Sequence, residues 1–106
     1  WKGYAPVSAA KVSLEALARS IAMDFAPYGL RCNVLQPGVT ETPALAAIPG
    51  SDRLKAHARL RNPFRRLTTP RDVANVVYLM CLDEAAWING SVIRVDGGEH
   101  VAGSTS

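Results

Sequence analysis

The sequence has few cysteines and histidines, no long apolar run and no strong excess of either charge. Its 106 residues include two cysteines and two histidines, and twelve basic against nine acidic residues give a net charge of +3. No apolar stretch approaches the roughly 20 residues that a membrane-spanning helix needs, and no basic-then-apolar start indicates an export signal. Cys32 and Cys81 lack the spacing of a metal or redox motif. We therefore expect a cytoplasmic protein with two buried thiols and no metal site.

Positive charge gathers in one stretch of the sequence, between residues 53 and 66. Such clusters usually form a solvated face, although they can receive an acidic partner or a phosphate. No aromatic platform or nucleic-acid-binding motif accompanies the charge, so nucleic acid is not expected as a partner. The basic cluster consists of Arg53, Lys55, Arg59, Arg61, Arg65 and Arg66.

The spacing of apolar residues predicts alternating helices and strands. A helix is expected over residues 7–26, where apolar residues recur at steps of three or four until a Pro-Tyr-Gly sequence ends it. The other side of this helix carries small residues, so we expect the helix to be buried between a sheet and a partner. Short strands are expected at residues 30–36 and 91–95, each followed by a glycine turn.

Two further helices are expected between the strands. A long connection over residues 40–63 contains a helix at about residues 51–60, and a connection of this length is often a functional lid. Thr69, Pro70 and Asp72 predict the start of the next helix, because they suit its N-cap, its first position and the positive end of its dipole. The short polar tail after the second strand is expected to fray.

This order of elements indicates an α/β protein, namely the C-terminal part of a Rossmann-like doubly wound parallel sheet. Two parallel strands leave unpaired edges and little apolar cover, so we do not expect these residues to fold well alone. The Gly-x-Gly-x-x-Gly turn that binds dinucleotides does not occur in the chain. We therefore expect the dinucleotide-binding half to precede Trp1, and residues 1–106 to be the C-terminal portion of a single domain.

Tyr4 and Lys11 lie seven positions apart near the start of the first predicted helix. Such positions return to within roughly 20° of each other around a helix and lie about 10 Å apart along its axis. Helical side chains lean toward the N-terminus, so Lys11 reaches toward Tyr4. A phenol has a pKa near 10, and a nearby ammonium lowers that pKa toward the working range of a proton donor. The alternative is that both residues are ordinary surface side chains.

Several motifs, in the right order and at the right intervals, resemble the short-chain dehydrogenase/reductase family. They include Ser8-Ala9-Ala10-Lys11, Leu30-Arg31-Cys32-Asn33, Gln36-Pro37-Gly38, Glu41-Thr42-Pro43, Thr69-Pro70-Arg71-Asp72-Val73-Ala74, Ile88-Asn89-Gly90 and Val95-Asp96-Gly97-Gly98. In that family Lys11 corresponds to the lysine of a Tyr-x-x-x-Lys signature. The signature tyrosine would then fall at position 7, where this chain has Val7.

The departure at Val7 has two interpretations. In the first, the chain is a family member that has lost its acid. In the second, Tyr4 serves instead, and the resulting Tyr-x6-Lys spacing resembles the enoyl-acyl-carrier-protein reductase branch of bacterial fatty-acid synthesis. We favour the second interpretation, because residues 62–66 (Asn-Pro-Phe-Arg-Arg) are similar to the segment after the substrate lid in that branch.

The resemblance implies an NAD(P)-dependent oxidoreductase that transfers a hydride from NADH or NADPH to the β-carbon of an enoyl thioester. Lys11 would hold the nicotinamide ribose, and Tyr4 would stabilise the enolate oxygen. Thr40 would meet the nicotinamide carboxamide through its backbone, and Thr42 would touch the pyrophosphate through its hydroxyl, although simple turn chemistry also explains both threonines. The cofactor-binding residues would be Lys11, Pro37, Gly38, Val39, Thr40 and Thr42.

The same resemblance implies a substrate lid and a set of partners. The lid would cover the acyl chain with Pro43, Ala44, Leu45, Ala46 and Ile48, so the chain would be the catalytic and substrate-lid portion of its domain. A second tyrosine of that branch would lie upstream of Trp1. His57 and His100 match no catalytic position and are expected at the surface. The substrate would be an acyl thioester on acyl carrier protein, and the protein would form a homo-oligomer, either a dimer or a tetramer.

Two alternative functions stay open at this point. One is a short-chain carbonyl or β-ketoacyl reductase, or an alcohol dehydrogenase, which is the commonest activity of the family; Val7 argues against it. The other is a non-catalytic family member that acts as an assembly subunit. The choice between NADH and NADPH also stays open, because the residue that recognises the 2′ position would precede Trp1.

Overall fold

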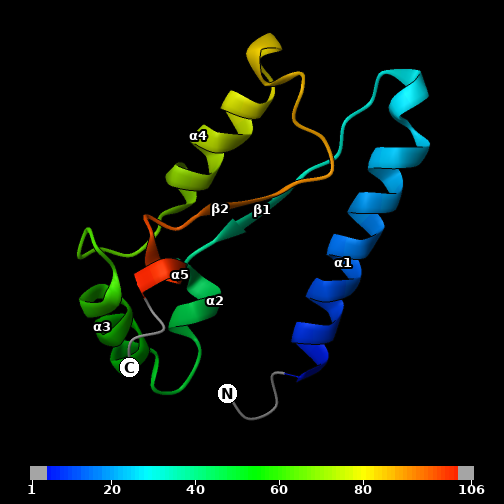
Figure 1. The fold of residues 1–106 in the computed structure, drawn as a ribbon. Coiled ribbons are helices and arrows are strands. Elements are labelled where there is room, and N and C mark those ends of the chain that lie inside the picture. Colours follow the sequence, from blue (N-terminus) through cyan, green and yellow to red (C-terminus); the bar gives the residue numbers. More distant parts are fainter. Residues whose placement is uncertain (1–4, 103–106) are drawn as a thin grey trace. The chain divides into compact units, whose positions relative to one another are not determined.

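The computed structural model describes residues 5–102 of the chain, which form two compact units. Within the described range, the first unit comprises residues 5–34 and Leu82–Ile93, and the second comprises Leu35–Cys81 and residues 94–102. Figure 1 shows the helices and strands in their order along the chain. No helix in the described range is long and apolar enough to cross a membrane.

The first unit contains the long helix α1 (Ala5–Asp24). This helix confirms the one predicted over residues 7–26, with each end two residues earlier. Pro6 falls in its first turn, where the missing N–H leaves no helical bond unmade. After a short 3-10 turn (Ala26–Tyr28), Gly29 turns the chain with a φ of 78°, a left-handed conformation that glycine adopts without strain.

Helix α1 has few buried side chains. Among residues 8–24 the buried side chains are Ala18 and Ala22, whereas Leu14 and Leu17 are exposed. The burial of this helix between a sheet and a partner stays a prediction. The buried apolar residues elsewhere in the described range are also mainly alanines, joined by Leu67.

Two asparagines hold the first unit together. The Asn89 side chain donates to the Ala22 carbonyl near the end of α1 at 3.0 Å and accepts from Cys32 N at 3.0 Å. The Asn33 side chain accepts from Ser91 N at 2.9 Å. Cys32 O also accepts a backbone bond from Gly90 N at 2.9 Å. The regular strand starts at residue 34, whereas the sequence predicted a start at residue 30.

The sheet has two neighbouring strands, which are β1 (Val34–Pro37) and β2 (Val92–Val95). Val34 N donates to Ser91 O at 2.8 Å, and Gly38 N donates to Val95 O at 3.3 Å. Both residue numbers rise together from one bond to the next, so the strands run in parallel (Figure 1). The prediction of an α/β chain with a parallel sheet is confirmed.

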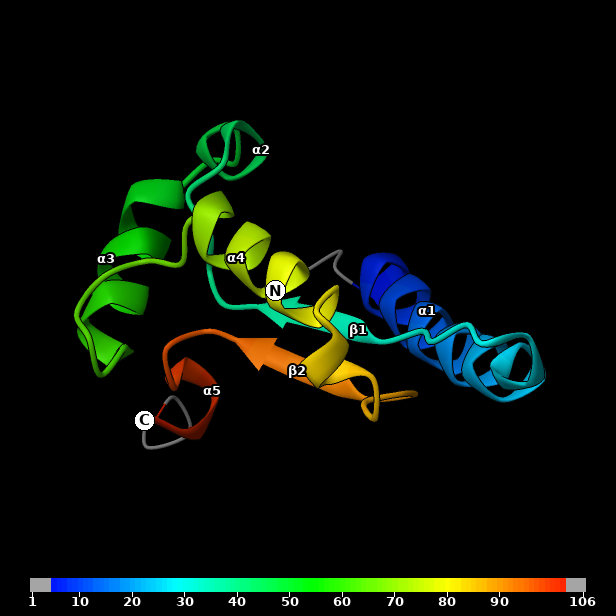
Figure 2. The same cartoon turned by 90° about the horizontal axis from the view of Figure 1, so that it is seen from above.

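The second unit contains four helices, which are α2 (Pro43–Ala46), α3 (Ser51–Arg61), α4 (Pro70–Met80) and α5 (Glu99–Ala102). Helix α3 contacts both α2 and α5, and Figure 2 shows these short elements beside it. The helix predicted at about residues 51–60 is confirmed as α3, whereas α2 was not predicted.

Helix α5 replaces the first half of the fraying tail that the sequence predicts. The Asp96 carboxylate accepts from Gly98 N and from His100 N, each at 3.0 Å. One carboxylate therefore binds two backbone N–H groups of the turn that starts the helix. The predicted tail is wrong for Glu99–Ala102, and residues 103–106 lie outside the described range.

Helix α4 starts as the sequence predicts, with a reciprocal cap. Asp72 N donates to Thr69 Oγ1 at 3.2 Å, and Thr69 N donates to Asp72 Oδ2 at 2.8 Å, which forms a capping box. Arg66 adds two bonds to the same carboxylate, at 2.7 and 3.0 Å. The Arg66 guanidinium, together with the Thr69 N–H, holds the pKa of Asp72 well below its usual range.

Replacing Thr69 with alanine should lower the free energy of unfolding by about 1 kcal/mol, because the first turn of α4 loses its side-chain acceptor. Thr69→Ser keeps the hydroxyl and should stay within a few tenths of a kcal/mol of the wild type, by roughly the same comparison. Urea unfolding of the intact protein measures both variants. An alanine variant as stable as the serine variant would show that the cap contributes nothing.

Candidate active site

Most of the residues predicted to bind a cofactor lie in the β1 loop, which we define as residues 37–42. Thr68 holds this loop from one side: Thr68 N donates to Val39 O at 3.1 Å, and Glu41 N donates to Thr68 O at 3.2 Å. The result is a parallel bridge between Thr40 and Thr68, and Thr68 is buried. In such a bridge Thr40 directs its own N–H and C=O away from Thr68. Thr68 therefore leaves both of these Thr40 backbone groups unused.

Gly38 allows the β1 loop to approach its neighbours closely. A Cβ atom at this position would lie 2.9 Å from Thr68 Oγ1, 3.0 Å from Asp96 Cβ and 3.1 Å from Glu99 Oε2. These separations are shorter than van der Waals contact. Glycine is therefore required here by space and not by its backbone angle.

Thr40 and Thr42 both use their hydroxyls within the chain. Thr40 Oγ1 donates to Gly38 O at 2.8 Å, and Thr42 Oγ1 accepts from Leu45 N at 3.1 Å as the N-cap of α2. Both threonines therefore form the local side-chain bonds to the backbone of a turn that the sequence offers as the alternative explanation. A hydroxyl that accepts one bond can still donate its hydrogen, so capping α2 leaves Thr42 able to donate to a ligand.

A buried carboxylate, Glu99, reaches the β1 loop from α5. Its side chain is among the buried polar groups, at 8% exposure of the residue, and Oε2 accepts from Val39 N at 3.1 Å. Arg61 Nη2, at the end of α3, lies 3.7 Å from the same oxygen. Sequence reasoning missed Glu99. The usable indication was topological, because Gly38 and Glu99 follow two parallel strands whose carboxyl ends share one edge of the sheet.

One cavity of about 340 Å³ lies at this edge of the sheet. Its position beyond the carboxyl ends of parallel strands is where ligands bind in open α/β sheets. Glu99 and Arg61 line it together with part of the β1 loop. The full set of lining residues is Gln36, Pro37, Gly38, Arg61, Arg94, Asp96, Glu99 and His100.

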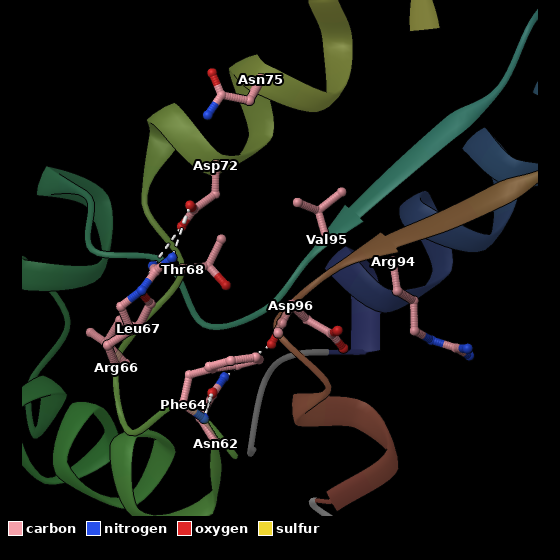
Figure 3. A pocket seen from close by; sticks show the side chains of 11 residues that line it. Asn62, Phe64, Arg66, Leu67, Thr68, Asp72, Asn75, Arg94, Val95 and Asp96 are labelled. Atoms are coloured by element: carbon pink, nitrogen blue, oxygen red, sulfur yellow. Dashed lines mark hydrogen bonds and ion pairs between the residues drawn. The ribbon is translucent and has the colours of Figure 1, made fainter. Parts of the chain in front are cut away.

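A second cavity of about 350 Å³ lies beside the start of α4 (Figure 3). Figure 3 shows Asp72 and Asn75 of α4 on one side and Asn62 and Phe64 on the other. Asn62 is buried, and its side chain donates to Asp96 O at 2.9 Å and accepts from Phe64 N at 2.8 Å. This asparagine therefore joins the segment after α3 to the end of β2.

The predicted lid lies between the β1 loop and α3. Helix α2 contains Pro43, Ala44, Leu45 and Ala46, and Ile48 follows it. Leu45 and Ile48 are half-buried, whereas the other three are exposed. The assignment of this segment as a substrate lid stays a prediction.

Of the predicted catalytic pair, only Lys11 is described, and it belongs to the first unit. Lys11 lies on α1 with an exposed side chain. Tyr4 lies outside the described residues. The predicted cofactor-binding residues of the β1 loop therefore lie together in the second unit, whereas Lys11 belongs to the first unit.

The basic cluster is largely paired with acids of the same chain. Lys55 lies 2.9 Å and Arg59 3.9 Å from Glu41, and the Lys55 ammonium lowers the pKa of Glu41. Arg61 pairs with Glu99, and Arg66 pairs with Asp72. The cluster is mainly solvent-exposed, as the sequence favours, and four of its members also form ion pairs within the second unit.

The predictions about the histidines and cysteines have different outcomes. His57 and His100 are exposed, as expected. Cys32 is half-buried and Cys81 is exposed, so the prediction of two buried thiols is wrong. Within residues 5–102, no group of three or more histidine, cysteine, aspartate or glutamate side chains is placed to hold a metal ion.

Comparison with known proteins identifies the family. A family model described as enoyl-(acyl carrier protein) reductase matches residues 1–100. The NADH-dependent enoyl-[acyl-carrier-protein] reductase FabI of Escherichia coli K12 is 37% identical over 99 residues, which are 93% of this chain and 38% of that protein. The cis-4-hydroxycyclohexanecarboxylate dehydrogenase of Sinomonas cyclohexanicum is 36% identical over 91 residues, 86% of this chain and 36% of that protein.

A solved short-chain dehydrogenase/reductase from Mycobacterium ulcerans superimposes with a TM-score of 0.76 at 30% identity, over 87% of this chain and 34% of that one. The chain spans about a third of the length of the curated relatives it matches. The motifs, the parallel strands and these matches agree. The chain belongs to the short-chain dehydrogenase/reductase family and corresponds to the C-terminal portion of its Rossmann-type fold.

Proposed function

We propose that the intact protein is an NAD(P)-dependent enoyl-[acyl-carrier-protein] reductase. One observation carries this choice within the family: Tyr4 and Lys11 are separated by six residues, and Val7 occupies the position that the shorter signature gives to tyrosine. The family model described as enoyl-(acyl carrier protein) reductase supports it. The identity with the Escherichia coli reductase, over nearly the whole chain, supports it as well.

The β1 loop has groups that fit a nicotinamide dinucleotide. The Thr40 N–H and C=O turn away from Thr68, and a carboxamide needs one acceptor and one donor of this kind. The Thr42 hydroxyl has a hydrogen to donate to a pyrophosphate oxygen. Lys11 supplies three donors for the ribose hydroxyls. The residues that would hold the cofactor are thus Lys11, Pro37, Gly38, Val39, Thr40 and Thr42.

The chemistry divides between the cofactor and two side chains. A bound reduced nicotinamide supplies the hydride that adds to the β-carbon of the enoyl thioester. Tyr4 donates a hydrogen bond to the thioester oxygen, where negative charge develops as the double bond is reduced. Lys11 keeps a positive charge near that phenol, which favours proton donation. Residues 43–48 cover the acyl chain and exclude water.

Further elements of the proposal concern the setting of the reaction. The acyl chain is carried by acyl carrier protein, and the enzyme works in the cytoplasm as a homodimer or homotetramer. NADH and NADPH are both candidates, and initial rates with each cofactor separate them.

A second candidate is a carbonyl reductase or alcohol dehydrogenase. The Sinomonas cyclohexanicum dehydrogenase supports it, since its identity with this chain is close to that of the enoyl reductase. Val7 disfavours it, because this reaction in the family uses a tyrosine at that position.

The substrate preference of the intact protein tests the proposal. We expect oxidation of NADH or NADPH with crotonyl thioester and none with acetoacetyl thioester or a simple ketone. Initial rates with each cofactor and each substrate give the preference for one substrate over another and for one cofactor over the other. Turnover of acetoacetyl thioester alone would replace the proposal with the second candidate, and failure to bind either cofactor would remove the oxidoreductase assignment.

A further inference from the structure

We propose that Glu99, paired with Arg61, is a positioning residue that fixes the β1 loop for the nicotinamide cofactor. The proposal rests on the proposed function, because it assumes that the Thr40 backbone meets the carboxamide. It assigns a role to a residue that lies 60 positions away from the loop in sequence.

The hydrogen bonds around Val39 fix two successive peptide planes. The first plane contains the Val39 N–H, which Glu99 Oε2 holds at 3.1 Å. The second contains the Val39 C=O, which Thr68 N holds at 3.1 Å. A planar trans peptide points its N–H opposite to its C=O, so the Thr40 N–H is directed away from Thr68. Glu99 and Thr68 together therefore determine where Thr40 presents its backbone groups.

The pair contributes little as a stabilising device. Glu99 Oε1 and Arg61 Nε are buried and have no hydrogen-bond partner among residues 5–102. A buried ion pair with unsatisfied atoms gains little over its desolvation cost. The closest Arg61–Glu99 separation is 3.7 Å, longer than the direct bond to Val39 N. The position of Glu99 therefore suits fixing the β1 loop better than stabilising the fold as a whole.

Arg61 connects this arrangement to α3. It is the last residue of that helix and lies against the Glu99 oxygen that binds Val39. The opposite end of the β1 loop is also bound to α3, through the Glu41–Lys55 pair at 2.9 Å. The loop is thus tied to one helix at two places by carboxylates.

Titration of the intact protein with NADH and NADPH tests the proposal, with nicotinamide fluorescence as the signal. We expect Glu99→Ala to raise the cofactor Kd about tenfold, since a hydrogen bond from the loop to a charged acceptor is lost. Glu99→Gln keeps an oxygen that can accept from Val39 N–H, and it should bring the Kd back to within about threefold of the wild type. The KM for crotonyl thioester at saturating cofactor should stay nearly constant.

Thr69→Ala is the matched control for lost stability, because it weakens α4 without touching the β1 loop. Its cofactor Kd should equal that of the wild type. If Glu99→Ala is insoluble, Arg61→Met replaces it, and an increase in Kd of the same sign is expected.

Two results would overturn the positioning role. One is a cofactor Kd for Glu99→Ala within twofold of the wild type. The other is an equal increase in Thr69→Ala, which would mean that any loss of stability weakens binding. A wild type that binds neither NADH nor NADPH would instead reject the proposed function, so the two failures are distinguishable.

Discussion

Tyr4→Phe should lower kcat with crotonyl thioester by about 10²- to 10³-fold, the usual effect of removing one donor from a developing oxyanion. The substitution removes a single oxygen and keeps the ring. KM for the thioester should change much less, because the bond to the carbonyl oxygen strengthens as charge develops there. Steady-state kinetics on the intact protein measure both constants.

The control for this variant is Tyr28→Phe. Tyr28 is 77% exposed and follows α1 in the short 3-10 turn, so losing its hydroxyl should leave kcat unchanged. Equal turnover of Tyr4→Phe and the wild type would show that another group donates to the substrate. The chain would then fit the interpretation in which the family acid is lost.

Lys11→Met extends the same prediction. Lysine has two proposed roles, near the phenol and at the ribose, so its loss should reduce kcat and also raise the cofactor KM. Tyr4→Phe should leave the cofactor KM near the wild-type value. A Lys11→Met variant with normal cofactor KM would remove the ribose contact from the proposal.

Gly38→Ala should have the largest effect among substitutions in the β1 loop. The added Cβ would lie 3.1 Å or less from Thr68, Asp96 and Glu99, which belong to two different parts of the second unit. Thr68 and Glu99 are buried and cannot simply turn into solvent. Overpacking of this kind costs about 1–3 kcal/mol. Because the loop must shift, cofactor affinity should fall together with stability.

Gly29→Ala separates crowding from backbone strain. A Cβ at Gly29 meets nothing within 4 Å, but its φ of 78° is left-handed. This variant should lose about 1–2 kcal/mol from strain alone and keep the wild-type cofactor Kd. Urea unfolding and cofactor titration on both variants provide the comparison. Gly38→Ala with unchanged cofactor Kd would contradict the placement of the cofactor at the β1 loop.

Local patterns predicted the helices better than the strands. Thr69, Pro70 and Asp72 specify the start of α4 through bonds that span three residues, so the sequence alone is sufficient. The segment just before β1 instead involves Asn89, whose side chain accepts from Cys32 N, 57 residues away in the sequence. Such a distant side-chain bond leaves no periodic trace in the sequence.

The site divides in the same way. A Pro-Gly turn after a strand is visible in the sequence and predicted the position of the β1 loop, whereas the roles of Thr40 and Thr42 came from the family resemblance and stay predictions. Glu99 was missed because its partner, Val39, is 60 residues away and the bond joins a side chain to a backbone group. The short helix α5 was missed for a related reason, since the Asp96 carboxylate that caps it lies before a glycine pair, which reads as a turn in the sequence.

The position of the transferred hydrogen tests the enoyl reductase assignment most directly. The intact protein is incubated with crotonyl thioester and NADH or NADPH that carries deuterium at C4 of the nicotinamide, and the product is examined by NMR and mass spectrometry. We predict butyryl thioester with deuterium at the β-carbon. The enoyl reductase assignment would be contradicted if crotonyl thioester were not reduced and acetoacetyl thioester gave a product with deuterium on its carbinol carbon.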